Sequence, residues 1–343
     1  MVDSKQQWKA WLYLSPAIVL LLIFTVWPII NTVLMAFQEN YNALAVMNGA
    51  TYKWGLGNFT TVLKDPQFLQ ALTNTLILCI PTVLLSTFLA LVISVCLNSI
   101  KPLQKFLQTI FFLPYVTNSI AIGMVFAAMF TVVGNTTTMR PIIETTGIIN
   151  TALDSIGLLE ALDKVPLFEE YINVYKSFNY ETGEEIIKYY VQWIGPGSKY
   201  EMNMFVMIVY IIWNALPFKI LILLGGLQSV NKQYYDAAKV DGTSAVRTFT
   251  RITVPLLSPM ITYVVITGFI GGFKEYTSIV GIFGDTMGPV GASGRLNTMV
   301  GLIYDSLEGM DTGMASASAL ILFVIIFVIT MINLKITNKT THY

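Results

Sequence analysis

Three charged residues stand inside stretches that are otherwise apolar, and they are the first candidates for chemistry in this chain. Lys219 interrupts the apolar stretch 202–227, and Lys274 and Glu275 follow a glycine-rich segment in the stretch 261–283. A charge at the centre of a bilayer costs about 2.5–3.5 kcal/mol, so a charged residue at that depth is expected to face a polar cavity or a partner. These residues therefore indicate a path for a polar solute or an ion.

The sequence lacks the residues that several other kinds of chemistry require. The chain has two cysteines, Cys79 and Cys96, and one histidine, His342, so the sequence does not support a disulfide framework, a zinc site or a histidine-based triad. It contains no Gly-x-x-x-x-Gly-Lys-Ser/Thr motif, so we expect no P-loop for ATP. The 20 basic and 20 acidic residues balance, which gives no indication of a nucleic-acid partner. We expect a chain that is not an enzyme and holds no metal or cofactor.

The elements that must position these charges are membrane-spanning helices. Apolar residues make up 55% of the chain and charged residues 12%, with a mean hydropathy of +0.65, whereas soluble domains carry about 25% charged residues. A helical span needs about 20 residues. We therefore predict an all-α integral membrane protein with six transmembrane helices, near 11–37, 71–97, 106–133, 202–227, 261–283 and 313–334.

Lysine and arginine are denser on the side of the membrane that holds the two termini. Lys5 and Lys9 precede the first span, Lys101 and Lys105 lie in a short connection, and Lys335 follows the last span. The positive-inside rule then predicts that both termini are cytoplasmic. The first apolar stretch is too long for the core of a signal peptide, so we expect an uncleaved anchor.

Two connections are long enough to carry function. The external insert near 137–200 is rich in Glu, Lys and Tyr in its middle part, 159–190, where the segment 167–175 has a helical, amphipathic pattern. Two interpretations stay open for this insert, a small lid or subdomain and a solvated spacer. The second connection, 228–260, is cytoplasmic in this topology.

The cytoplasmic loop 228–260 contains capping and terminating residues that predict two short helices. Side chains that cap a helix and residues that end one alternate along it. Asn231 can cap the first helix and Gly242 can end it, while Thr243 or Ser244 can cap the second and Pro255 can stop it.

The first of these helices suits a groove in a partner. Ala237 and Ala238 leave little side chain on one face, so another backbone can approach closely, and Tyr234, Tyr235 and Val240 supply apolar contacts beside it. The alternative is an interfacial helix that lies on lipid.

The same loop resembles the Glu-Ala-Ala loop of binding-protein-dependent ABC importer permeases. Asp236 stands where that family usually has Glu, and Ala237, Ala238, Asp241, Gly242 and the segment 252–259 complete the motif. The family's usual approach to the second span is matched by 55–59, 65–68 and 74–75. Similarity to maltose-type sugar permeases lies in 111–115, 225–228 and 333–335. The resemblance covers about residues 11–336, apart from the insert near 159–190.

The resemblance implies a type I importer permease. Its parts would be a first helix with an external loop (1–66), a core of five helices (67–336) that contains the insert near 137–200 and the coupling loop 228–260, and a cytoplasmic tail (337–343). The implied partners are a second permease subunit, two cytoplasmic ATPase subunits that carry ATP and Mg²⁺, an external solute-binding protein and membrane lipid. The implied function is import of a sugar or an oligosaccharide across the plasma membrane of a prokaryote.

Two groups of site residues follow from the resemblance. The ATPase contacts would be Tyr235, Asp236, Ala237, Ala238, Asp241 and Gly242. The sugar contacts would be Tyr115, Asn118, Ser119, Leu216, Pro217, Ile220, Phe273, Lys274 and Tyr276. Aromatic faces beside hydroxyl, amide and charged groups do suit a sugar. Helix packing is the alternative explanation for the small residues Gly268, Gly271 and Gly272.

The two adjacent charges allow a more specific expectation. On a continuous helix, neighbouring side chains point about 100° apart. The two charges therefore cannot simply neutralise each other, and at least one should face a polar cavity. Because 273–276 also resembles the family's sugar-contact stretch, we expect Lys274 to face the translocation path and Glu275 to pair with a basic group on a neighbouring helix. Lys219 is the candidate for that group, unless it snorkels to the cytoplasmic surface.

Two other functional classes are the alternatives. An ion-coupled secondary transporter would use Lys274 and Glu275 as a relay. A membrane-embedded enzyme would need a nucleophile and a base, and Cys79, Cys96 and Glu275 form no recognisable constellation.

Overall fold

Most of the chain is helical and apolar, as predicted. The computed structural model describes residues 7–39, 41–49, 51–100, 104–135, 142–179, 184–284 and 296–340. Within them, four helices are long and apolar enough to cross a membrane, Trp8–Ala36, Pro66–Ser99, Tyr200–Ser229 and Thr312–Lys335, and two bent helix pairs raise the number of candidate spans to six. The chain divides into two compact units, residues 1–69 with 302–325 and residues 70–301 with 326–343.

The first unit contains the first span and the connection that follows it. Its elements are α1 (Gln7–Leu21), a π-helical turn (Leu22–Val26), α2 (Trp27–Ala36), β1 (Gln38–Glu39), α3 (Ala43–Met47), β2 (Lys53–Trp54), α4 (Gly57–Lys64) and parts of α16 (Met299–Glu308) and α17 (Thr312–Thr340). The buried Asn58 amide donates to the carbonyls of Ala36 and Gln38 at 3.1 and 2.9 Å. The Thr312 hydroxyl donates to the Tyr41 carbonyl at 3.0 Å. These bonds attach α4 to the end of α2 and the start of α17 to the connection after β1.

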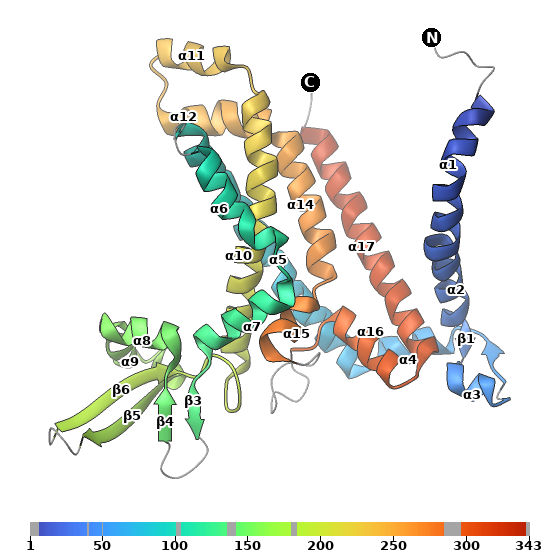
Figure 1. Ribbon diagram of the computed structural model, residues 1–343, viewed down its shortest axis with the longest axis horizontal. Helices are drawn as coiled ribbons and strands as arrows, with labels where there is room; N and C mark the ends of the chain where they lie inside the picture. Colours follow the sequence, from blue (N-terminus) through green and yellow to red (C-terminus); the bar gives the residue numbers. More distant parts are fainter. Residues whose placement is uncertain are drawn as a thin grey trace. The chain divides into compact units, whose positions relative to one another are not determined.

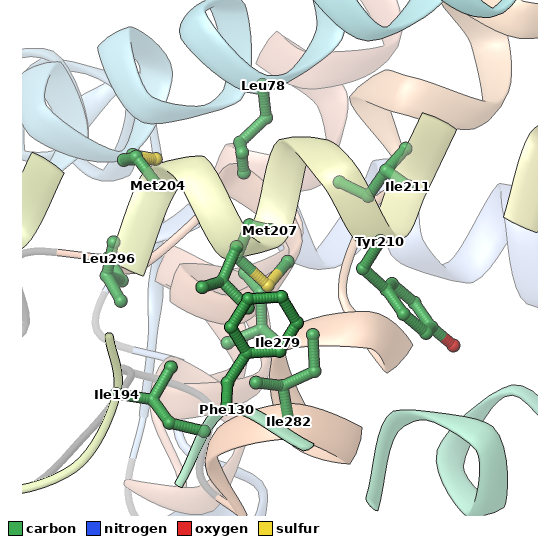
Figure 2. Packing of buried hydrophobic residues seen from close by; sticks show 11 residues of the cluster. Leu78, Phe130, Ile194, Met204, Met207, Tyr210, Ile211, Ile279, Ile282 and Leu296 are labelled. Carbon is green, nitrogen blue, oxygen red and sulfur yellow. The ribbon is translucent and has the colours of Figure 1, made fainter. Parts of the chain in front are cut away.

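The second unit is built around α10 (Tyr200–Ser229). Its other membrane helices are α5 (Pro66–Ser99), α6 (Gln104–Val116), α7 (Ser119–Phe130), α14 (Ser258–Phe273) and α15 (Thr277–Phe283). One apolar cluster joins α10 to α5, α7 and α15, and its members Phe130, Met207 and Ile279 lie together in Figure 2. A second cluster joins α10 to α5 and α14. These two clusters fix the helices that surround the candidate site.

The predicted span 106–133 is not one straight helix. α6 and α7 meet at an angle of 99°. Asn118 adopts an extended conformation at the bend, and its side-chain oxygen accepts hydrogen bonds from the backbone N–H groups of Ile120 and Ala121 at 2.9 and 3.3 Å. This side chain therefore caps a new helix inside the apolar stretch.

The predicted span 261–283 is also interrupted. α14 ends at Phe273 and α15 begins at Thr277. At its other end α14 begins directly after α13 (Val254–Leu256), at a bend of 70°. Lys274 and Glu275 therefore lie in a break, and the expected 100° separation on a continuous helix does not apply to them.

Short β-hairpins lie outside the spans of this mostly helical fold. Three two-stranded antiparallel sheets occur in the described residues, β1 with β2, β3 (Val133–Asn135) with β4 (Ile142–Thr145), and β5 (Ile172–Asn179) with β6 (Glu184–Val191). The helix expected at 167–175 is a 3₁₀ turn, Glu169–Tyr171, followed by β5. Both strands of this hairpin are rich in β-branched and aromatic residues, which favour a pleated surface over a helix.

The insert forms a subdomain with a core of its own. It contains α8 (Gly147–Ser155), α9 (Leu158–Asp163) and the β5–β6 hairpin. Leu159, Ile172 and Val191 are buried together, with Trp193 packed against them. Figure 1 shows this subdomain at one end of α10 and α11 (Lys232–Val240) at the other end. A shared core favours the subdomain interpretation over the solvated spacer.

Asn150 should be the residue on which this subdomain depends most. Its fully buried amide donates to the carbonyls of Thr146 and Val191, and its oxygen accepts from the Val191 N–H and the Trp193 ring N–H, at 2.8–3.0 Å. We expect Asn150→Ala to destabilise the insert by about 3 kcal/mol or more, because buried groups lose their partners. Limited proteolysis of the membrane-embedded protein measures this. Ser155→Ala, on the exposed end of α8, is the control, and equal resistance of both variants would contradict the prediction.

Candidate functional site

A cavity of about 440 Å³ opens among the helices of the second unit. Its walls come from α5, α6, α10 and α14, and the break after α14 closes one side. The lining residues are Thr82, Val83, Ser86, Tyr115, Ile211, Asn214, Ala215, Phe218, Lys219, Thr267, Gly268, Gly271, Gly272 and Glu275.

One wall of the cavity is aromatic. The rings of Tyr115 and Phe218 stack with centroids 5.7 Å apart and an interplanar angle of 19°. The Tyr263 ring is tilted against Phe218, with ring centroids 6.4 Å apart. Half of the Tyr115 surface is exposed. This wall offers a flat apolar face, the kind of surface that C–H groups of a sugar ring contact.

The polar groups of the cavity lining are mainly hydroxyls. Thr82 and Thr267 donate to the carbonyls of Leu78 and Tyr263, one helical turn away, at 2.5 and 2.7 Å. Ser86 likewise donates to the Thr82 carbonyl. Because each hydroxyl proton is used within its own helix, the oxygen remains an acceptor. Asn214 adds an amide, which offers both donors and an acceptor.

Lys219 is neither paired with Glu275 nor directed to the cytoplasmic surface, so both expectations for it are wrong. Only 3% of its surface is exposed. Its ammonium donates to the Val83 carbonyl at 3.2 Å and to the Ser86 and Thr87 hydroxyls at 2.7 and 2.9 Å. The absence of a side chain at Gly268 leaves room for the ammonium, because a Cβ there would lie 3.2 Å from Nζ. Three polar groups of α5 thus replace the expected carboxylate.

Glu275 holds the break between α14 and α15. Its Oε1 accepts from the backbone N–H groups of Tyr276 and Ser278, both at 3.2 Å, and its carbonyl accepts from the Thr298 hydroxyl at 2.8 Å. The carboxylate caps the start of α15 in place of pairing with a lysine. Glu275 lines the cavity, whereas Lys274 is exposed and lies outside the lining. The expected orientation of these two residues is therefore reversed.

The other predicted sugar contacts are placed unevenly. Tyr115 lines the cavity. Asn118 is exposed and caps α7, and the Ser119 carbonyl accepts from the Tyr210 hydroxyl at 2.8 Å. Ile220 and Phe273 are buried in the protein, 2% and 1% exposed. Leu216 packs against the α10 core, Pro217 is buried in α10, and Tyr276 is partly buried at the start of α15. Contact of these residues with a sugar stays a prediction.

Sequence reasoning missed the contribution of α5. Thr82 and Ser86 stand four residues apart, which places them on one helix face that can reach Lys219. That spacing is a usable signal in a span that is otherwise apolar. Phe218, next to Lys219 in sequence, was missed because a single phenylalanine in a span is unremarkable.

The glycines of α14 have two roles. A Cβ at Gly272 would lie 2.6 Å from the Cys79 sulfur, so this glycine allows α14 to approach α5. Gly271 has open space on its side, and it faces the cavity. The packing explanation therefore applies to Gly268 and Gly272.

The loop at the other end of α10 contains the two expected helices. The Asn231 side chain caps α11, accepting from the Gln233 N–H at 3.0 Å, and Gly242 ends it with a φ of +63°. Ser244 caps α12 (Ala245–Thr248), which continues through a π-helical turn (Phe249–Thr253) into α13. This helix ends at Leu256 and passes through Pro255, because a proline near the start of a helical segment lacks only its own donor.

α11 has an inner and an outer face. Ala238 is buried, and the Tyr235 hydroxyl lies 3.4 Å from that of Thr253, so these residues attach α11 to its own chain. Tyr234, Ala237 and Val240 point outward, with Val240 89% exposed. The predicted partner contact at Ala238 is therefore corrected, because this residue is turned toward the chain itself. The other predicted contacts, Asp236 and Asp241, are exposed.

A family model and several known proteins match this chain. The model described as "Binding-protein-dependent transport system inner membrane component" matches residues 82–341. The arabinooligosaccharides transport system permease protein AraP of Halalkalibacterium halodurans is 28% identical, over 98% of this chain and 89% of its own.

Two solved structures share the fold. A bacterial ABC transporter involved in the import of the acidic polysaccharide alginate has a subunit with a TM-score of 0.71 and 21% identity, over 98% of both chains. The bacterial alginate ABC transporter in complex with an alginate pentasaccharide-bound periplasmic protein has one with a TM-score of 0.68 and 22% identity, over 96% of this chain and 93% of the other.

Proposed function

Because this chain belongs to the family of binding-protein-dependent transport system inner membrane components, we propose that its cavity is part of the path by which a sugar or an oligosaccharide enters the cell. The chain is a multi-pass bacterial inner membrane protein and a permease subunit of an ABC importer. It is a transport subunit and works with a solute-binding protein.

The cavity carries the proposal for a sugar. The stacked rings of Tyr115 and Phe218 line the same cavity as hydroxyl groups of α5 and α14 and the Asn214 amide. A saccharide presents C–H faces that contact aromatic rings and hydroxyls that need both donors and acceptors. The similarity to AraP, named for arabinooligosaccharides, supports the same class of solute.

The energy source belongs to other subunits in this proposal. The sequence has no P-loop motif, so ATP and Mg²⁺ would bind two cytoplasmic ATPase subunits. The outer face of α11, with Tyr234, Ala237 and Val240, would enter a cleft of one of them. A second permease subunit would complete the path, because this chain alone does not enclose the cavity.

The positions of Lys274 and Glu275 weaken the case for an ion-coupled secondary transporter. Lys274 lies outside the cavity lining, and the Glu275 carboxylate bonds to backbone N–H groups. The family to which the chain belongs depends on a binding protein.

Reconstitution tests the proposed function. The two permeases and the ATPase are placed in liposomes with the cognate binding protein, and uptake of radiolabelled oligosaccharides is measured with ATP inside the vesicles. We expect saccharide uptake that needs both ATP and the binding protein and that a protonophore leaves unchanged. Uptake abolished by the protonophore with ATP present, or no saccharide among the solutes carried, would contradict the proposal.

The insert is expected to dock the binding protein. Its subdomain exposes Ile156, Leu167 and Phe168 beside charged residues, with Leu167 73% exposed, and exposed apolar patches on a folded subdomain mark interaction sites. Changing Leu167 and Phe168 to Ser should raise the binding-protein concentration that half-stimulates the ATPase by roughly tenfold, about 1.4 kcal/mol. Val174→Ser on the hairpin is the control. Unchanged stimulation in the double variant would assign the insert another role.

A further inference from the structure

One segment of the loop 228–260 runs across the ends of the membrane helices. α12, the π-helical turn after it and α13 form a helical segment, Ala245–Leu256, which meets α14 at a bend of 70°. Figure 1 shows α12 crosswise to α10 and α14, with α11 on the far side of it. With a rise of about 1.5 Å per residue, the segment is about 18 Å long, yet at this bend it climbs only about 6 Å along the axis of α14. The segment therefore stays at the level where this span leaves the membrane.

The inner side of the segment is packed against the spans. Phe249 and Val254 contact an apolar cluster whose members include Leu97, near the end of α5, and Leu227, near the end of α10. This packing fixes which side of the segment is turned outward.

The outward side combines two arginines with an apolar residue. Arg247 and Arg251 are exposed and stand four residues apart, about one helical turn, so they share a face. Val246, next to Arg247, is 74% exposed. Basic and apolar side chains together on a helix at the membrane surface are typical of a helix that lies in the lipid interface, with its cations among the headgroups.

Neither arginine has an acidic partner within this part of the chain. Between Asp241 and Glu275 the sequence contains no acidic residue. Among the residues that the structure describes, neither guanidinium is paired with a carboxylate. Basic residues at a membrane surface attract anionic headgroups, and a guanidinium can hold a phosphate with two parallel hydrogen bonds. Charge complementarity therefore favours an anionic lipid as the partner of this face.

The ATPase takes a different surface of the same loop in the proposed function. That surface is the outer face of α11, with Tyr234, Ala237 and Val240. α11 lies farther from the spans than α12 does, whereas α12 continues through α13 directly into the bend before α14. The two arginines are thus placed beside the membrane surface.

We propose that Arg247 and Arg251 bind the phosphate of an anionic membrane lipid and that this lipid holds the segment Ala245–Leu256 on the membrane surface. The inference goes beyond the proposed function and does not depend on which solute is carried. The segment connects α11 to α14, and α14 contributes Thr267, Gly268 and Gly271 to the cavity. An anionic lipid therefore steadies the connection between the proposed ATPase contact and the transport path.

Native mass spectrometry tests this inference, because it resolves individual lipids bound to a membrane complex. The complex of both permeases and the ATPase is delipidated in detergent and titrated with phosphatidylglycerol and, separately, with phosphatidylcholine of the same acyl chains. The dissociation constants of the first bound lipid are compared. We expect the wild-type complex to bind phosphatidylglycerol about tenfold more tightly, and the double variant Arg247→Gln with Arg251→Gln to keep a preference of about threefold or less.

Lys232→Gln with Lys239→Gln is the matched control. It also removes two positive charges from exposed positions of the loop, but it removes them from α11. This control should keep the preference for phosphatidylglycerol. An equal loss in both double variants would reduce the effect to net charge, and an undiminished preference in the arginine variant would place the lipid elsewhere. Either result overturns the proposal.

Two further measurements decide between lipid and protein as the partner. The arginine variant should still co-purify with the ATPase. Loss of the ATPase together with an unchanged lipid preference would show that Arg247 and Arg251 contact the ATPase instead. The wild-type preference should also weaken with rising salt, because attraction between charges is screened. A preference that is independent of salt would contradict the proposal even if the arginine variant failed to assemble.

Discussion

Ala237→Glu is expected to release the ATPase from a permease that still folds and inserts. Ala237 lies on the outer face of α11 between Tyr234 and Val240, and its small side chain permits close approach of a partner. A glutamate there would carry a charge into an apolar cleft that has no partner for it. Such a change costs about 3–5 kcal/mol, which corresponds to a loss of affinity of roughly a hundredfold or more. Co-purification of the ATPase with the tagged permease measures the effect.

Two further alanine-to-glutamate variants, at other positions of the loop, are the controls for this result. Ala245→Glu places the charge in the exposed first turn of α12, where an acid is favourable near the helix N-terminus, and it should leave the ATPase bound. Ala238→Glu places it on the buried inner face, so it should lower the yield of folded permease. An ATPase that stays bound to the Ala237→Glu protein would show that the outer face of α11 is not the contact.

Local signals in the sequence were sufficient for the cytoplasmic loop. Asn231, Gly242 and Ser244 each act through their own backbone neighbourhood, so their roles follow from residue type and spacing. The face on which Ala238 lies depends on contacts with the segment around Thr253, which is packed by tertiary structure. The helices were therefore predictable, but the orientation of α11 was not.

At the cavity, too, local sequence signals predicted less than the tertiary structure determines. The intramembrane charges were identified as functional candidates from the sequence alone, because their cost in lipid is independent of the fold. Their partners were not, because Lys219 bonds to hydroxyls more than 130 residues away in the sequence and Glu275 caps a helix that begins where a continuous span was expected. A polar residue inside an apolar run can cap a new helix as well as face a cavity, and hydropathy alone does not distinguish these roles. Asn118 is a second example, because it caps α7 at a bend where one continuous span was expected.

A last prediction concerns the crossing of α7 and α15, where two glycines meet. A Cβ added at Gly123 would lie 2.8 Å from the Gly281 Cα and 2.9 Å from its carbonyl carbon. Backbone atoms cannot rotate away as a side chain can, so the two helices would have to separate. Because α15 follows directly from Glu275 and belongs to the apolar cluster around Met207, separation would also move one wall of the cavity.

Gly123→Ala should therefore destabilise the permease by about 1–3 kcal/mol, the usual cost of an overpacked contact, even though alanine is the better helix former. Gly225→Ala is the matched control, since a Cβ at this position of α10 meets nothing within 4 Å. At Gly225 the helix propensity acts alone, and we expect a gain of about 0.5–1 kcal/mol. Thermal unfolding of the purified permease in detergent measures both changes, with a lower midpoint for Gly123→Ala and an equal or higher one for Gly225→Ala. If both variants move the midpoint in the same direction, the close approach of α7 and α15 is not what holds this end of the unit together.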